Sequence, residues 1–421
     1  MQTTTGIWTR RAIFNLLLVA MAGSLLRYKI LYAVPGIDYK NIMHAHSHFA
    51  FSGWVSLCLS VCIAGMLNLN DQRFRHYHFS FWLLWIAAFG MLLSFPFGGY
   101  NIVSITFSTL SIFASWHFSF IAWKDLESSN LPLVVVYWIR AALFFYVISS
   151  AGPFFLAKLM ATGNTDQQWY IGSVYFFLHF QYNGWFTFAV LGLFLGMLHR
   201  KGISINSREI FRVQFLACIP AFFLSTLWMK LPQWLYVIAV AAALGQVFAL
   251  MLLIQSIWKK RKAIRQSFDK VPFVLCGLAL IAFGIKTCMQ ALSVFPDLSY
   301  LAFGFRPVVI GYLHLVLLGF VTFFLIGYIF QAGYLSLSNG RPLPGIICFV
   351  TGVILNELFL FIQAIASIAG TYIPQINYFL FMAALLMLAG LIVLNYSQLN
   401  NNLFKYGISS NKQRGATAST S

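Results

Sequence analysis

Three of the nine histidines in this chain occupy the same position in a repeated sequence pattern. The pattern is a histidine, four residues, a glycine, a tryptophan or phenylalanine, any residue, and a serine or threonine. It begins at His48, His179 and His314, which are 131 and 135 residues apart. Neutral imidazole is the most common ligand for heme iron, copper and zinc in such a setting. The repeat therefore predicts a shared heme or metal site, although a lone histidine in a membrane helix is as often a packing residue.

Two more histidines come just before the first copy of the pattern, in the run MHAHSH at residues 43–48. On a helix His44 and His48 share one face, and His46 points roughly the other way. Three imidazoles within five residues are costly in lipid, which favours a functional role. We take His48, His179 and His314 as candidate ligands of this heme or metal site, with His44 and His46 as further candidates beside the first. His44 could instead anchor the wet end of its helix.

The elements that must position these residues are long apolar segments. The 421 residues are 60% hydrophobic and 9% charged, whereas roughly a quarter of residues are charged in soluble proteins. Long apolar runs between short polar loops are typical of helical membrane proteins and not of outer-membrane barrels. We therefore expect an all-α polytopic membrane bundle. Its twelve predicted spans are 12–35, 43–67, 79–98, 102–123, 131–157, 171–198, 212–230, 233–257, 271–294, 306–331, 343–369 and 374–396.

The three copies of the pattern fall on the second, sixth and tenth predicted spans. A period of four spans predicts three four-helix repeats around a pseudo-threefold axis. All even-numbered spans run in the same direction, so the three histidines enter the membrane from one side, in its outer third. The glycine on the next turn would let a neighbouring helix or a flat macrocycle approach closely.

The basic residues indicate the orientation of the bundle. With both termini in the cytoplasm, the inner loops and tails hold 19 of the 27 Lys and Arg residues, and the outer side holds 6. We interpret the net charge of +18 as this bias and not as a nucleic-acid surface. The expected organisation is a cytoplasmic tail over 1–11, a transmembrane domain over 12–398 and a partly disordered cytoplasmic tail over 399–421. The expected location is a bacterial inner (plasma) membrane, with lipid as the surrounding partner.

The sequence resembles the catalytic subunit of heme-copper oxidases and nitric oxide reductases, and it is also similar to the NnrS family, which has a span with closely spaced histidines. The likeness covers the twelve-span core. The run from His179 to Trp185 is similar to the reductase run H-x-x-x-E-G-x-W, with Asn183 in place of the glutamate. Tyr312 stands where the superfamily has the first of two histidines on span ten, and the histidine pair of span seven is absent.

This resemblance implies that His314 and either His46 or His48, with His44 as a third option, bind a low-spin heme of b-type or a related type. It implies that His179 ligates a second metal, copper or non-heme iron, in an incomplete binuclear site. It also implies an oxidoreductase with redox, nitric oxide or oxygen chemistry near the outer face. An electron-donor cytochrome or quinol and additional membrane subunits are the implied partners.

Arg140, Lys286 and Glu357 are ionisable residues predicted inside the membrane. Such groups tend to face the interior of a bundle. Arg140 or Lys286 could bind heme propionates, and Glu357 could relay protons or form a buried ion pair with Lys286 that fixes helix packing. The cations near the outer ends of the spans are equal candidates for the propionates: Arg27, Lys29 and Arg306.

Two other functions stay open at this point. A twelve-helix transporter without a metal cofactor is compatible with the span count and the buried charges, although transporters usually show two halves or inverted repeats. A histidine-box lipid hydroxylase is disfavoured because its H-x-x-H boxes are missing. The six cysteines lie in apolar spans without a CxxC pair, so we expect them to pack as small apolar side chains.

Overall fold

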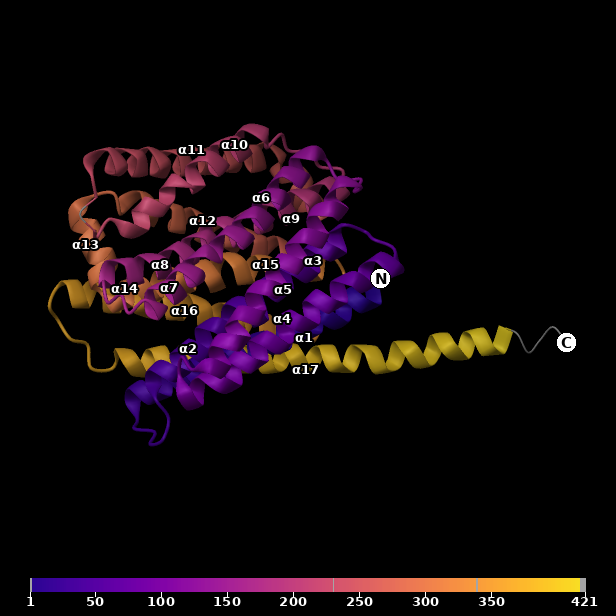
Figure 1. Cartoon of the computed structure of the whole chain (residues 1–421). Coiled ribbons are helices and arrows are strands. Elements are labelled where there is room, and N and C mark those ends of the chain that lie inside the picture. The colour runs from indigo at the N-terminus through magenta and orange to yellow at the C-terminus, as the bar shows by residue number, and fades with distance from the viewer. Residues whose placement is uncertain (1, 230, 338–339, 417–421) are drawn as a thin grey trace.

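The computed structural model describes residues 2–229, 231–337 and 340–416. Helices account for 85% of it and no β-strand occurs in these ranges, so the all-α prediction is confirmed. The start of α1 (Gln2–Leu31) and the end of α17 (Ile376–Ala416) point to the same end of the bundle (Figure 1). Helix α17 packs against both α1 and α16 (Leu343–Ile368). Of the tail predicted over 399–421, residues 399–416 belong to α17, and residues 417–421 lie outside the described ranges.

The other elements follow between α1 and α16 along the chain, and three of them are π-helices. In chain order they are α2 (Tyr39–Phe49), π-helix η1 (Ala50–Ser56), α3 (Leu57–Met66), α4 (Asp71–Gly98), α5 (Ile102–Glu127), α6 (Leu133–Ser149), α7 (Ala151–Ala161), α8 (Gln167–His179), π-helix η2 (Phe180–Phe186), α9 (Thr187–Arg200), α10 (Arg208–Cys218), 3-10 helix η3 (Pro220–Thr226), α11 (Gln233–Ser267), α12 (Lys270–Leu292), α13 (Pro296–Gly304), α14 (Arg306–His314), π-helix η4 (Leu315–Thr322) and α15 (Phe323–Gln331).

In the described part of the chain, ten helical segments are long and apolar enough to cross a membrane. They are Thr4–Leu31, Tyr39–Met66, Asp71–Gly98, Ile102–Glu127, Leu133–Ala161, Gln233–Ser267, Lys270–Leu292, Arg306–Gln331, Leu343–Ile368 and Ile376–Gln398. An eleventh results if α10 and η3, which meet at 45°, count as one span. The polytopic membrane bundle is therefore confirmed at the level of about ten such helices.

The run from α8 to α9, at the position of the predicted sixth span, is not among those ten segments. It is long enough, but it carries His179, Gln181 and Asn183 near its middle. These polar side chains lower its mean hydropathy. All three are buried inside the bundle, so they do not meet lipid.

The loop between α4 and α5 is short because both helix ends are capped. Gly99 ends α4 with a φ of +57°, a conformation that favours glycine, and its N–H donates to the Phe95 carbonyl at 2.8 Å. Asn101 starts α5 with a capping box: its side chain accepts from the Ser104 N–H at 3.0 Å, and the Ser104 hydroxyl accepts from the Asn101 N–H at 2.9 Å. These two caps hold Tyr100 in a fixed place beside α2.

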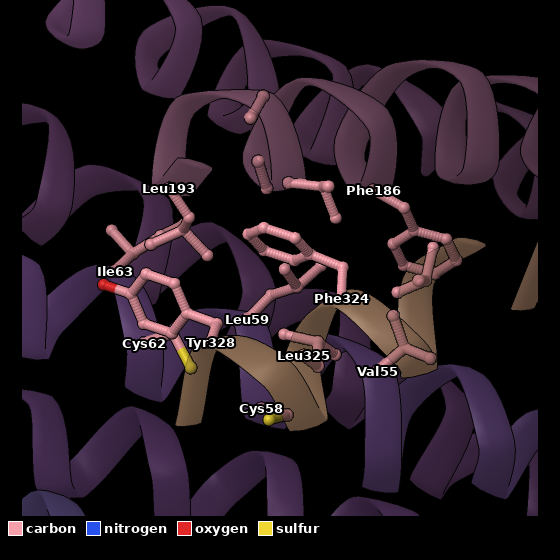
Figure 2. Packing of buried hydrophobic residues seen from close by; sticks show 14 of the residues in the cluster. Val55, Cys58, Leu59, Cys62, Ile63, Phe186, Leu193, Phe324, Leu325 and Tyr328 are labelled. Atoms are coloured by element: carbon pink, nitrogen blue, oxygen red, sulfur yellow. The ribbon is translucent and has the colours of Figure 1, made fainter. Parts of the chain in front are cut away.

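The centre of the bundle lies where the second, sixth and tenth predicted spans meet. Buried side chains from three separate segments pack there on one another (Figure 2). In a bilayer, close packing of this kind, and not the exclusion of water, holds helices together. Cys58 and Cys62 have no exposed surface and pack in this core like small apolar residues. The labelled members are Val55, Cys58, Leu59, Cys62, Ile63, Phe186, Leu193, Phe324, Leu325 and Tyr328.

Candidate functional site

The repeated pattern has the same local structure in all three copies. A π-helical segment of seven or eight residues begins one residue after His179 and His314, and two residues after His48. Each segment contains the glycine and the aromatic residue of the pattern. π-Helical turns within α-helices are rare and occur frequently at functional sites. The pattern therefore corresponds to a specific backbone feature as well as to a run of residue types.

The tryptophans of the pattern connect one copy to another. Trp54 Nε1 of the first copy donates to Thr322 Oγ1 of the third copy at 2.8 Å, across 268 residues of sequence. Trp185 Nε1 of the second copy donates to Ser56 Oγ of the first copy at 3.2 Å. The third copy has Phe320 at this position, which has no N–H to donate. The serine or threonine of the pattern thus serves as the acceptor for the tryptophan of another copy.

His46 and His314 line the same cavity. It lies among α1, the α2–η1 segment, the α14–η4 segment, α16 and α17, and it encloses about 720 Å³ of empty space, part of it open to the surroundings. The cavity is lined by Leu16, Val19, Ala20, Gly23, Ser24, Arg27, His46, Ala50, Trp54, Val55, His314, Leu317, Leu318, Thr322, Phe349, Asn356, Ala384, Met387 and Leu391.

The two imidazoles in the cavity are anchored in the same way. Nδ1 of His46 lies 3.1 Å from the Val19 carbonyl oxygen, and Nδ1 of His314 lies 2.9 Å from the Ile310 carbonyl oxygen. A carbonyl oxygen can only accept, so each Nδ1 carries the hydrogen and each Nε2 keeps its lone pair. In the described structure neither Nε2 makes a hydrogen bond. Metal-ligating histidines usually show this arrangement, with the second ring nitrogen bound to a carbonyl or carboxylate.

A glycine on α1 makes room for the His46 ring. A Cβ atom built on Gly23 would lie 3.2 Å from Cε1 and 3.6 Å from Nδ1 of His46. Contacts this short would force the ring to move. Gly23 also lines the cavity, next to Ser24 and one turn from Val19 and Arg27. The sequence signal for this position is the small-residue run Ala20-Met21-Ala22-Gly23-Ser24, which is typical of closely packed membrane helices and was not singled out above.

Arg27 is the cationic residue that lines the cavity. It lies close enough to His314 and Glu357 for their charges to influence one another. The other outer cations are occupied elsewhere. Lys29 donates to the Val34 carbonyl at 3.0 Å, and Arg306 donates to the Tyr39 hydroxyl at 3.1 Å. An anionic group bound in the cavity would therefore meet Arg27.

His44 and His48 face a different environment. Nε2 of His48 shares a hydrogen bond with the Tyr100 hydroxyl at 2.9 Å, and its ring stacks on Phe95 at 4.7 Å between centroids. The His44 ring packs edge-on against Tyr100 at 4.8 Å. Partial burial raises the pKa of Tyr100 to about 12, so the phenol stays neutral at physiological pH. Neither histidine is among the residues that line the cavity.

His179 lies in a closed polar cluster. Its ring has no exposed surface; Nε2 donates to the Cys218 carbonyl at 2.9 Å, and Nδ1 accepts from the Asn183 amide at 3.1 Å. The Lys286 ammonium donates in turn to Asn183 Oδ1. Both ring nitrogens of His179 are thus engaged, and a cation lies beside its partner. Within the described residues no group of three or more His, Cys, Asp or Glu side chains could hold a metal ion. The residues around His179 do not fit a second metal.

The other ionisable residues of the spans also have polar partners. Lys286 donates to Asn183 and forms no ion pair with Glu357, whose carboxylate accepts from the Asn356 amide at 3.1 Å. Arg140 pairs with Glu127 at 3.0 Å. Asp125, which the sequence did not indicate, is a buried acid that accepts from Arg73 Nε and from the Tyr77 hydroxyl, both at 2.6 Å. The Lys286–Asn183, Arg140–Glu127 and Asp125 contacts connect helices, whereas the Asn356–Glu357 contact lies within α16 and Asn356 lines the cavity.

A scan against protein-family models and a search of curated proteins found no match for this chain. Fold and site together define a polytopic helical membrane protein with two anchored histidines in one intramembrane cavity. We infer its function from that cavity.

Proposed function

We propose that the chain is an integral membrane heme protein in which His46 and His314 bind the iron of a b-type heme. One observation carries the proposal: two imidazoles from distant helices line one cavity, and each is anchored by Nδ1 to a backbone carbonyl and keeps Nε2 for a ligand. A site prepared for metal ligation looks like this, whereas packing histidines commonly use both nitrogens. The mainly apolar lining of the cavity favours an apolar group over a bare ion.

The roles of the residues follow from their contacts. His46 and His314 would hold the heme iron, and the carbonyls of Val19 and Ile310 would set the orientation of the rings. Arg27 would neutralise carboxylate groups at the cationic end of the cavity. The Trp54–Thr322 hydrogen bond would keep the helices of the two histidines in register, because it joins the residues just beyond them. A heme with two imidazole ligands supplies one-electron transfer, since no iron position is left for a substrate.

The wider architecture supports the same conclusion. We propose that the α8–α9 run and the bent α10–η3 pair complete twelve spans, arranged as three four-helix repeats with both termini in the cytoplasm of a bacterium. The shared π-helical segments support this arrangement, and so do the two tryptophan bonds, which run from the first copy to the third and from the second to the first. In this reading the chain is a degenerate relative of the heme-copper oxidase catalytic subunit that passes electrons near the outer face from a cytochrome or quinol.

The test is the optical spectrum of the purified full-length protein, with the heme content determined per chain. We expect a Soret band and about one heme per chain in the wild type. His46→Ala and His314→Ala should lose most of the heme. His48→Ala, a change of the same kind two residues along the same helix, should retain it. Added imidazole should restore part of the heme binding in the two ligand variants, which would separate ligand loss from misfolding.

A wild-type protein without heme after expression with sufficient iron would contradict the proposal and favour a transporter. Undiminished heme in His46→Ala would contradict the assigned ligand. A His179→Ala variant that loses the heme as completely as His314→Ala would place the site elsewhere in the bundle.

A further inference from the structure

A second cavity is lined by residues of the α14–α15 helix run that do not line the histidine cavity. It has about 880 Å³ of empty space, part of it open to the surroundings, between α9, α11, α12 and the η4–α15 segment. Its lining is apolar, with phenylalanines from three of these segments, and the exception is one charged side chain, Arg261. None of the histidines lines it, so nothing in the proposed heme chemistry uses this space.

The shape of this cavity follows the helices. On α11 its lining extends from Leu253 to Ile264, and on α12 from Phe273 to Phe283. At a rise of 1.5 Å per residue, each stretch covers about 15 Å along the helix axis. Because α11 and α12 are joined by a short turn, Arg261 and Phe273 lie at the same end of the cavity. The space is therefore elongated, apolar along its length and cationic at one end.

The cationic end belongs to a dense basic run. Lys259, Lys260, Arg261, Lys262 and Arg265 lie within seven residues near the end of α11, and all five are exposed. None of them forms an ion pair with a described residue. The Arg261 guanidinium stacks on the Trp258 ring at 4.5 Å, and Nη1 donates to the Trp258 carbonyl at 2.9 Å. Tryptophan and basic residues at the end of an apolar span are typical of the membrane–water interface.

We propose that this cavity binds an anionic phospholipid, with one acyl chain in the apolar channel and the phosphate at Arg261. An elongated apolar space with a cation at its interfacial end is complementary to an anionic amphiphile. Basic pockets between transmembrane helices bind anionic lipid head groups through the same charges. A neutral amphiphile such as a quinol would fill the apolar channel but would make no ionic contact with Arg261.

Two variants test the two ends of the site separately. Arg261→Gln removes the charge that lines the cavity. Gly277→Leu fills the channel, since Gly277 lines it and a Cβ there would have no neighbour within 4 Å, so the fold should tolerate the change. The matched controls are Lys201→Gln, which removes an exposed charge from another loop, and Gly284→Leu, which alters an equally open glycine of α12 outside the cavity.

The measurement is native mass spectrometry of the delipidated full-length protein titrated with phosphatidylglycerol or phosphatidylcholine of identical acyl chains. We expect the wild type to bind phosphatidylglycerol more tightly. Arg261→Gln should weaken that binding about fivefold, and Gly277→Leu should abolish retention of either lipid at this site. The two controls should bind like the wild type.

Several results would overturn the proposal. They are equal binding of the two lipids by the wild type, retention of the lipid by Gly277→Leu, and an equal loss in Lys201→Gln, which would show a general surface-charge effect. A quinol that binds the wild type in preference to phosphatidylglycerol would overturn it too.

Discussion

The histidine cavity and the His179 cluster are built on the same local framework but differ in what surrounds the imidazole. In both, the histidine directly precedes a π-helical segment: η4 after His314 and η2 after His179. His314 uses one nitrogen for a backbone carbonyl and presents the other to a cavity. His179 uses both nitrogens, for a carbonyl and for Asn183, and Lys286 closes the cluster.

This difference shows that the repeated pattern specifies a backbone and a packing position, whereas the neighbours of each ring decide whether it can bind a ligand. A glycine beside His46 leaves space for ring and ligand. An amide and an ammonium beside His179 leave none. A buried lysine without a carboxylate partner is costly, so Asn183 is essential for the stability of the His179 cluster. Asn183 does not line the histidine cavity. Variants can therefore separate the two regions.

The largest expected effect is the closure of the open cavity by Gly23→Leu. A Cβ at this position would lie 3.2 Å from Cε1 of His46, and the rest of the leucine would occupy the cavity. We expect loss of nearly all bound heme with the helical content unchanged, measured by optical spectroscopy and circular dichroism. Gly284→Leu, on α12 and away from the cavity, should keep its heme. Full heme occupancy in Gly23→Leu would show that the cofactor binds elsewhere.

The second effect concerns the stability of the closed cluster. Asn183→Leu removes the acceptor for Lys286 and the donor to His179, and it leaves a buried charge without a partner. The loss of a hydrogen bond to a charged group typically destabilises a protein by about 1.5–3 kcal/mol. We expect lower resistance to denaturant in detergent, with the heme content per folded chain unchanged. Asn183→Asp retains an acceptor for Lys286 and should be clearly more stable than Asn183→Leu. A selective loss of heme in Asn183→Leu would instead tie the two regions together.

Much of this arrangement could be predicted from the sequence, but not the choice among the histidines. Apolar runs predict the helices, and the repeat brings His314 and the His44–His48 cluster to one side of the membrane. The repeat register matches His48 to His314, yet His46 is the residue that shares the cavity with His314. The choice depends on the rotation of α2 and on Tyr100, which the caps of Gly99 and Asn101 hold beside His48.

The anchors of the two rings were also beyond sequence analysis. The acceptors are the backbone carbonyls of Val19 and Ile310, which any residue type could supply. The same holds for His179, whose Nε2 is bound by the carbonyl of Cys218 on α10. Backbone acceptors leave no residue-type signal, so an open ring and a closed ring look alike until the helices are packed.

The third prediction concerns the electrostatics of the open cavity. Arg27 lines it, and a positive charge near a heme favours the reduced iron. Arg27→Gln should therefore lower the midpoint potential, by about 50 mV if the interaction is worth about 1 kcal/mol. A redox titration followed at the Soret band measures this shift. Lys286→Gln, in the closed cluster, should shift the potential less. A larger shift of the potential in Lys286→Gln than in Arg27→Gln would mean that Lys286, and not Arg27, is the cation nearer to the heme.

The smallest expected effect distinguishes the two tryptophans of the repeat. Trp54→Phe and Trp185→Phe each remove one buried hydrogen bond between copies and should each cost about 1 kcal/mol of stability. The third copy has phenylalanine at this position, so the framework accepts the change.

The effects of the two variants on the heme should differ, because Thr322, the acceptor of Trp54, lines the cavity, and Ser56, the acceptor of Trp185, does not. Trp54→Phe should release heme faster than the wild type in a transfer assay to apomyoglobin, and Trp185→Phe should release it at the wild-type rate. Equal release rates would mean that the open cavity is not held in shape by the contact between the first and third copies.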